Sequence, residues 1–212
     1  MVISVFYIFE LIGTVAFAIS GSMLAIDKRA DLFGVLFLGF TTAVGGGIVR
    51  DLFLGNIPPK AFTNEIFIIV ALFVSLVLFL SVKILKGKYL EKTVMVENIN
   101  NVFDALGLGA FTVTGMQLAI AAGHGENMLY VLFLGVATGV GGGLIRDVMV
   151  KEIPFILRKR IYALASISGG IVYYLLYFNN VNQTVSAVCA ISVVFGLRMM
   201  ATIFKWSLPK AL

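Results

Sequence analysis

The sequence predicts an all-α integral membrane protein with seven transmembrane helices, arranged as two inverted three-helix repeats plus a seventh helix. First, the 212 residues are 60% hydrophobic and only 13% charged, whereas soluble domains are about 25% charged. Second, the mean hydropathy of +1.03 is too high for a water-soluble surface. Third, a motif of three glycines followed by Arg-Asp occurs twice, at 45–51 and 141–147, each time inside an apolar run.

Each predicted helix is an apolar run bounded by short polar segments. A helix that crosses a bilayer takes about 20 mostly apolar residues, and seven runs qualify: 2–26, 32–54, 66–85, 102–122, 128–150, 161–178 and 185–204. Strands of a β-barrel would alternate apolar and polar residues over about 10 positions, and runs such as 66–80 do not alternate. We therefore expect one membrane domain over residues 1–212, with repeat one at about 2–85, repeat two at about 98–178 and the seventh helix at about 185–204.

The rare residues limit the classes of function. The first apolar run lacks a basic region and a small-residue cleavage site, so we interpret it as a retained helix and not a signal peptide. Cys189 is the single cysteine and His124 the single histidine, so we expect neither a disulfide framework nor a transition-metal site. The chain has no nucleophile–base set and no phosphate-binding loop, so we expect no enzyme and no cofactor. The net charge of +5 needs no nucleic-acid partner to explain it.

The loop cations predict the orientation in the membrane. Seven helices place the termini on opposite sides, and one side then carries most of the cations: Lys28, Arg29, Lys83, Lys86, Lys88, Lys92, Lys151, Arg158, Lys159, Arg160, Lys205 and Lys210. The other side has Lys60 and little else. Because cytoplasmic loops are rich in Lys and Arg, we expect the N-terminus outside and the C-terminus in the cytoplasm. The four lysines between positions 83 and 92 also suit anionic lipid head groups, or they set the topology alone.

An internal repeat extends well beyond the glycine motif. The segment 43–51 corresponds to 139–147 at an offset of 96 residues, and Glu10 corresponds to Asp104 at an offset of 94. Each copy contains three predicted helices, so the second copy enters the membrane from the opposite side. Inverted repeats with glycine-interrupted helices recur in transport proteins, whose binding or permeation sites lie near the midplane between the repeats.

Two interpretations fit the glycines, which are Gly45, Gly46, Gly47, Gly141, Gly142 and Gly143. Three consecutive glycines weaken a helix, at about 1 kcal/mol each relative to alanine, and are expected to kink it. A carbonyl exposed at such a kink suits a partly dehydrated monovalent cation. Alternatively, small residues four positions apart let two helices pack closely. The duplication and the Arg-Asp that follows favour a role in an ion pathway.

Charged residues within membrane helices are costly and are functional by default. The candidates are Glu10, Arg50, Asp51, Asp104, Arg146 and Asp147. We expect Glu10 to face Arg50 near the outer mouth of a pathway, and Asp104 to face Arg146 near the inner mouth. The neighbouring aspartates compete for the same arginines, and the alternative is that each arginine only snorkels to the interface beside its aspartate. Arg198 is expected to snorkel inward or to line a subunit contact.

The two three-helix repeats, the seventh helix and the doubled Gly-Gly-Gly-x-x-Arg-Asp motif resemble the prokaryotic branch of the trimeric intracellular cation (TRIC) channel family, whose bacterial members also carry a glycine transporter label. The resemblance covers about residues 10–204. It implies a homotrimer with one pore per subunit, located in the plasma (inner) membrane of a prokaryote. It also implies conduction of monovalent cations, chiefly potassium, along the kinked second and fifth helices. Animal members bind a phosphoinositide through a basic pair in the fourth helix, which is nearly free of Lys and Arg here, so we do not expect that lipid site.

We therefore expect a potassium-permeable channel whose path lies between the repeats. Potassium would be a transient occupant, and the four acids of the motifs and first helices would keep the local potential negative. Arg50 and Arg146 would tether the kinks and set the open probability. The main alternative is a secondary transporter for glycine or another small zwitterion, because broken helices can also bind a carboxylate and a cation. A third interpretation is a structural or lipid-organising membrane protein in which the glycines only pack.

Overall fold

The computed structural model describes residues 5–84, 93–158 and 161–206, and within these ranges every regular element is a helix. Six helices are long and apolar enough to cross a membrane. They are α1 (Val5–Asp27), α2 (Leu32–Phe53), α4 (Ile66–Ile84), α6 (Thr93–Ala119), α7 (Met128–Met149) and α10 (Gln183–Ile203). Six of the predicted spans are thus confirmed as long apolar helices. The ends of the predicted spans at 2 and 85, and the lysines at 86, 88, 92, 159 and 210, lie outside the described residues, as does Arg160.

The remaining elements are shorter. Helix α9 (Tyr162–Phe178) has 17 residues, which at 1.5 Å per residue gives about 26 Å, slightly less than a hydrocarbon core of about 30 Å. A seventh crossing by α9 therefore stays a prediction. Helices α3 (Lys60–Thr63) and α8 (Phe155–Arg158) and a π-helical turn, η1 (Ile120–His124), were not predicted.

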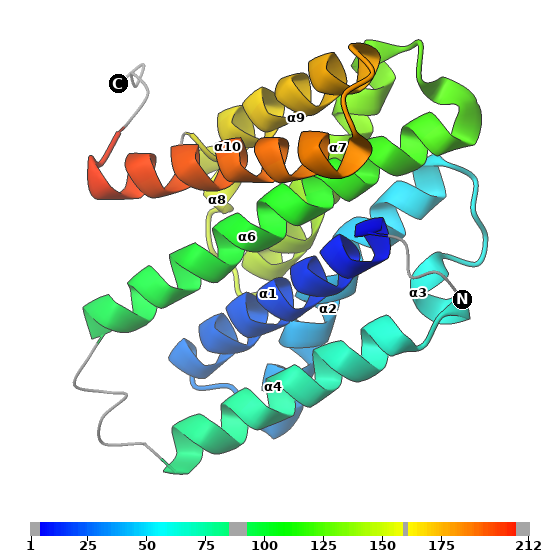
Figure 1. The fold of residues 1–212 in the computed structure, drawn as a ribbon. Coiled ribbons are helices and arrows are strands. Elements are labelled where there is room, and N and C mark those ends of the chain that lie inside the picture. Colours follow the sequence, from blue (N-terminus) through cyan, green and yellow to red (C-terminus); the bar gives the residue numbers. More distant parts are fainter. Residues whose placement is uncertain (1–4, 85–92, 159–160, 207–212) are drawn as a thin grey trace.

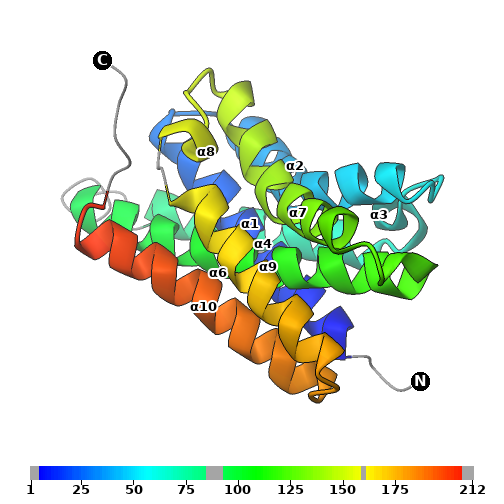
Figure 2. The ribbon, with the colours of Figure 1, turned by 90° about the horizontal axis from the view of Figure 1, so that it is seen from above.

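The helices form a bundle with α1 and α6 side by side at its centre (Figure 1). Helix α2 packs on α1, and α7 packs on α6, while α2 and α7 also contact each other. Helix α4 lies on one flank of the bundle, and α9 and α10 lie on the other (Figure 1). The view from above shows α9 and α10 running together (Figure 2). On α4 only Phe67, Ala71 and Ser75 are buried, so most of its apolar surface faces outward and suits lipid.

Reciprocal contacts relate the two halves of the chain. A Cβ added to Gly13 would lie 3.1 Å from the Phe111 ring, and one added to Gly107 would lie 2.2 Å from the Phe17 ring. Both pairs follow the offset of 94 residues, so the contact from the first half to the second is repeated in the reverse direction. Such reciprocity is characteristic of a two-fold relation between similar units.

Helices α2 and α7 also begin and end alike. Asp31 caps α2 by accepting from the Gly34 amide at 2.8 Å, and Asn127 caps α7 by accepting from the Tyr130 amide at 3.0 Å. These side chains supply an acceptor that the first turn of a helix lacks. The chain then leaves both helices through a residue at positive φ, which is 72° at Gly55 and 58° at Lys151.

Candidate functional site

Helices α2 and α7 touch backbone to backbone at the glycine motifs. A Cβ on Gly46 would lie 2.1 Å from the carbonyl oxygen of Thr138, and one on Gly142 would lie 2.1 Å from that of Thr42. Real Cβ atoms do not approach so closely, so each position admits only glycine at this crossing. The middle glycine of each motif therefore sets the distance between the two helices, as small residues do in membrane helix pairs.

The third glycine of each motif has a different surrounding. A Cβ on Gly47 would meet only the Arg50 guanidinium, at 3.7 Å from Nη2. The equivalent atom on Gly143 would lie 3.7 Å from Arg146 Nη2 and 3.1 Å from the Tyr162 hydroxyl. In both helices the arginine one turn further along lies over the surface that this glycine leaves free.

The predicted kinks are not confirmed, because α2 and α7 each run through the glycines as one α-helix. Close packing of the helices is present at these positions. Nearby hydroxyls bond back to their own helices: Thr42 and Thr138 each donate to the carbonyl four residues earlier, at 2.6 Å. This arrangement satisfies the hydroxyls locally. The expectation that a helix break exposes carbonyls to an ion is therefore not supported by these contacts.

The first charge cluster joins three helices and is called the Glu10 cluster below. Arg50 donates from Nη1 to Glu10 Oε1 at 2.9 Å and from Nε to Asp51 Oδ1 at 2.8 Å. Lys60 donates from Nζ to the other oxygen of Glu10 at 2.5 Å. The side chains of Arg50 and Asp51 are 1% and 2% exposed, whereas that of Lys60 is 36% exposed. The predicted Glu10–Arg50 pair is present, and it shares its carboxylate with a lysine.

The second cluster, called the Asp104 cluster, repeats this plan in the other half of the chain. Arg146 donates from Nη1 to Asp104 Oδ1 and from Nε to Asp147 Oδ1, both at 2.8 Å. Arg198 donates from Nη2 to the other oxygen of Asp104 at 3.3 Å. Arg146 Nη1 also donates to the Ser20 hydroxyl at 2.5 Å, which links this cluster to α1. The predicted Asp104–Arg146 pair is therefore present and fully buried.

The aspartate of each motif also holds the loop that follows its helix. Asp51 Oδ2 accepts from the backbone amide of Lys60 at 2.8 Å, where α3 begins. Asp147 Oδ2 accepts from the amide of Phe155 at 2.7 Å, where α8 begins. These carboxylates thus receive an arginine on one oxygen and a loop amide on the other. The sequence alone indicated only competition for the arginine.

Aromatic rings lie beside cations in both clusters. The Lys60 ammonium lies 5.1 Å from the Phe67 ring centroid and 5.8 Å from that of Tyr7. The Arg198 guanidinium lies 4.7 Å from the Tyr162 ring, and that of Arg146 lies 4.8 Å from the Phe155 ring. Aromatic faces attract cations at these distances, so they stabilise the cations in their places.

Each cluster holds two carboxylates and two cations, so its formal charge is zero. Each of the four acids is paired with a cation, so the formal charges do not support the expectation that the acids keep the local potential negative. Lys60 and Arg198 are the members that sequence reasoning missed. Arg198 does not snorkel away but pairs with Asp104 at 2% exposure. For Arg198, the available signal in the sequence was an arginine inside an apolar helix. For Lys60, the sequence offered no signal except that it is nearly the only cation on its side of the membrane.

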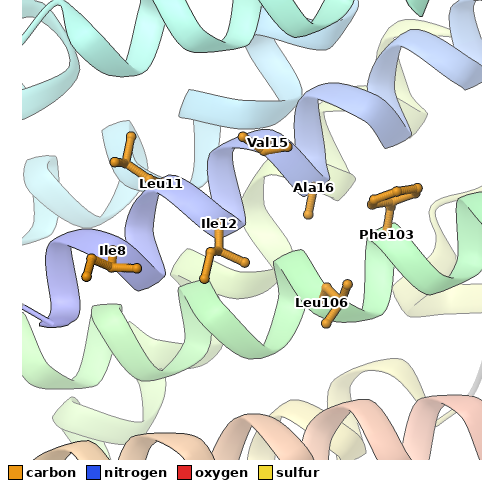
Figure 3. A pocket seen from close by; sticks show the side chains of 7 residues that line it. All are labelled: Ile8, Leu11, Ile12, Val15, Ala16, Phe103 and Leu106. Carbon is orange, nitrogen blue, oxygen red and sulfur yellow. The ribbon is translucent and has the colours of Figure 1, made fainter.

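An apolar groove of about 290 Å³ lies between α1 and α6 (Figure 3). Its lining comes from both helices: Ile8, Leu11, Ile12, Val15, Ala16, Phe103 and Leu106. These side chains offer no ligand to a cation, so the groove suits an acyl chain or another apolar surface. The polar chemistry of the described residues is concentrated instead in the two charge clusters.

Comparisons with known proteins add to this geometry. The family model described as a glycine transporter matches the chain twice, over residues 7–83 and 101–178. The inner membrane protein YadS of Escherichia coli is 39% identical over 204 residues, which are 96% of this chain and 94% of that protein. A membrane protein of Deinococcus radiodurans is 40% identical over 169 residues, covering 79% of this chain and 74% of the relative.

Solved structures share the fold over nearly the full length. One, which addresses conductance through TRIC cation channels, is 37% identical with a TM-score of 0.82 and covers 99% of this chain and 98% of its own. A TRIC trimeric intracellular cation channel orthologue from Rhodobacter sphaeroides is 28% identical with a TM-score of 0.85, covering 95% and 99%. A prokaryotic TRIC channel in 0.5 M KCl is 32% identical with a TM-score of 0.84, covering 96% and 98%.

Proposed function

The chain belongs to the trimeric intracellular cation channel family, and on this premise we propose that it is a potassium-permeable cation channel of a prokaryotic inner membrane. The observation that carries the proposal is the doubled charge cluster, one in each half of a two-fold-related helix bundle whose relatives are cation channels. Charged groups are costly inside a membrane and are retained where they serve transport or gating.

The ion path of this proposal runs between the two repeats, along α2 and α7, with one cluster near each end. The helices touch at Gly46 and Gly142, which leaves no space for an ion at the crossing. Conduction therefore requires the two helices to separate or shift there. Glycine favours such a movement because its backbone reaches conformations that other residues avoid.

The arginines act as tethers in this mechanism. Arg50 binds α2 to α1 through Glu10, and Arg146 binds α7 to α6 through Asp104. Such pairs are strong in a low-dielectric surrounding, where their rupture leaves uncompensated charges. Water that enters a mouth of the path weakens its pair, so hydration and opening are coupled. Once the helices have separated, carbonyls and hydroxyls that are now bonded within the helices replace part of the hydration shell of the passing potassium ion.

The assembly of this proposal is a homotrimer with one pore in each subunit, the N-terminus outside and the C-terminus in the cytoplasm. The trimeric channel orthologue among the similar structures supports the subunit number. The concentration of loop cations on one side supports the orientation. Under this orientation the Glu10 cluster lies at the outer mouth and the Asp104 cluster at the inner mouth. Membrane lipids, with anionic head groups near Lys83, are its other partners.

A secondary transporter for glycine is the second candidate, because the matching family model is described as a glycine transporter. Flux into proteoliposomes separates the two functions. If the protein is a channel, potassium leaves the proteoliposomes along the electrical gradient. The same proteoliposomes then show no saturable uptake of glycine. Uptake of glycine that saturates, together with liposomes that retain potassium, would favour the transporter. Protein that reconstitutes as a trimer but moves neither solute would favour a structural role.

A further inference from the structure

The two charge clusters differ in where their second cation comes from. In the Glu10 cluster it is Lys60, which lies on the short helix α3 within the first repeat. The residue 96 positions later is Ile156, which carries no charge. The Asp104 cluster instead takes Arg198 from α10, outside both repeats. The repeat alone does not dictate either cation, so the second cation is where the two mouths differ.

The second cations also differ in access to water. The side chain of Lys60 is 36% exposed, whereas that of Arg198 is 2% exposed. Ion pairs exposed to water contribute little to stability, because solvent screens the charges and a released lysine side chain regains conformational entropy. The buried guanidinium of Arg198 cannot leave its carboxylate for water in the same way. The ammonium of Lys60 is thus the replaceable member of the Glu10 cluster.

The surroundings of the Lys60 ammonium have the features of a monovalent-cation site. One carboxylate oxygen of Glu10 lies 2.5 Å from Nζ, and the faces of Phe67 and Tyr7 lie at 5.1 and 5.8 Å. A carboxylate oxygen and aromatic faces attract a free cation as well as one that is part of a side chain. A potassium ion carries the same charge as an ammonium group and is similar in size.

Charge balance favours a cation at this position when the lysine leaves. With Lys60 in place the cluster is neutral, and without it the two carboxylates and Arg50 leave a formal charge of −1. Arg50 remains on the other oxygen of Glu10, so the vacated oxygen is left without a cation. We propose that Lys60 is a tethered occupant of a monovalent-cation site on Glu10, and that potassium enters this mouth by displacing it.

This inference rests on the proposed channel function, and it is tested with Lys60→Gln in the full-length reconstituted protein. Lys28→Gln is the matched control, because it removes one exposed lysine from a surface pair with Glu152 at 2.6 Å. In planar bilayers we expect Lys60→Gln to raise the open probability several-fold when potassium is low on the α3 side. Lys28→Gln is expected to behave as the wild type. Equal currents from all three proteins would overturn the inference while leaving the channel intact.

A second measurement does not depend on conduction. The melting temperature of detergent-solubilised Lys60→Gln is expected to rise with KCl but not with choline chloride at equal ionic strength, since a bound ligand stabilises the folded state. The added substitution Glu10→Gln should abolish that rise. Lys60→Met serves the same test if Lys60→Gln does not assemble. Absence of a potassium-specific rise overturns the site, whereas a rise in protein that is silent in bilayers upholds the site and contradicts the channel.

Discussion

Asp104 of α6 and Arg198 of α10 form a buried ion pair, with 3.3 Å between Asp104 Oδ2 and Arg198 Nη2. This contact joins α10 to a cluster that otherwise belongs to the repeats. It also places the Arg198 guanidinium over the Tyr162 ring of α9. The last helix therefore contributes a cation to the Asp104 cluster and does not only cover α6 and α9.

Replacement of Arg198 tests this link. Arg198→Met keeps an unbranched apolar stem but removes the guanidinium, and so leaves Asp104 Oδ2 without Arg198 in a buried place. Loss of one partner of a buried pair costs about 3 kcal/mol, so we expect a clear fall in the melting temperature of the detergent-solubilised protein. Arg198→Lys should recover part of the loss. An unchanged melting temperature for Arg198→Met would show that the pair contributes nothing.

The glycine crossing offers a matched pair of substitutions. Gly46→Ala places a Cβ 2.1 Å from the Thr138 carbonyl oxygen, so α2 and α7 must move apart, whereas Gly47→Ala meets only the flexible end of Arg50 at 3.7 Å. Overpacking of this kind costs about 1–3 kcal/mol. We expect Gly46→Ala to lower the melting temperature and alter the currents. Gly47→Ala should be tolerated, and equal effects of both substitutions would contradict the assigned contact.

The tethers can be tested by a double-mutant cycle on Glu10 and Arg50. We expect Arg50→Gln and Glu10→Gln each to change the open probability, and the double variant to change it by less than the sum of the two. Residues in direct contact couple by about 0.5–3 kcal/mol. The same cycle on Asp104 and Arg146 should behave alike. Arg50→Gln and Arg146→Gln proteins that assemble and conduct as the wild type would remove the gating role.

The loop anchors predict a local change without a change in fold. Asp51→Asn keeps one acceptor oxygen where Arg50 Nε and the Lys60 amide now use two. Asparagine must then present an NH₂ group to one of these donors. We expect faster hydrogen exchange in peptides that cover the start of α3, measured by mass spectrometry. Peptides of α8 serve as the internal control, since Asp147 still holds them, and uniform exchange would refute the anchoring.

Orientation is checked by cysteine labelling in a Cys189→Ser background. Under the proposed orientation, Glu65→Cys reacts with a membrane-impermeant maleimide in intact cells. Arg29→Cys, in the loop between α1 and α2, should react only after permeabilisation. The reverse pattern would invert the assignment of the Glu10 and Asp104 clusters to the outer and inner mouths.

Helix positions could be predicted closely from apolar runs alone. The second predicted span, 32–54, became Leu32–Phe53, and the fifth, 128–150, became Met128–Met149. The fourth was predicted to begin at 102, but α6 begins at Thr93. Polar residues between positions 93 and 101, such as Glu97 and Asn98, lower the hydropathy of this segment without breaking the helix. Hydropathy therefore marks the apolar core of a helix and not its end.

The charge pairs could be predicted in part, for a physical reason. Glu10 and Arg50 lie on helices that the repeat places beside each other, and the duplicate supports the same assignment for Asp104 and Arg146. Lys60 has the uncharged Ile156 as its counterpart in the second repeat, and Arg198 lies outside both repeats, so no internal comparison brings either cation to the acids. The middle glycines were ambiguous because a kink and a close crossing need the same residue, and only the contact with Thr138 distinguishes them.

Single-channel recording of the purified protein in planar bilayers tests the central claim most directly. Under a KCl gradient the account predicts stepwise currents whose reversal potential lies toward the potassium equilibrium potential, and whose open probability changes in Arg50→Gln and Arg146→Gln. Silent bilayers from protein that is folded, trimeric and correctly inserted would contradict it, as would currents that reverse at the chloride equilibrium potential.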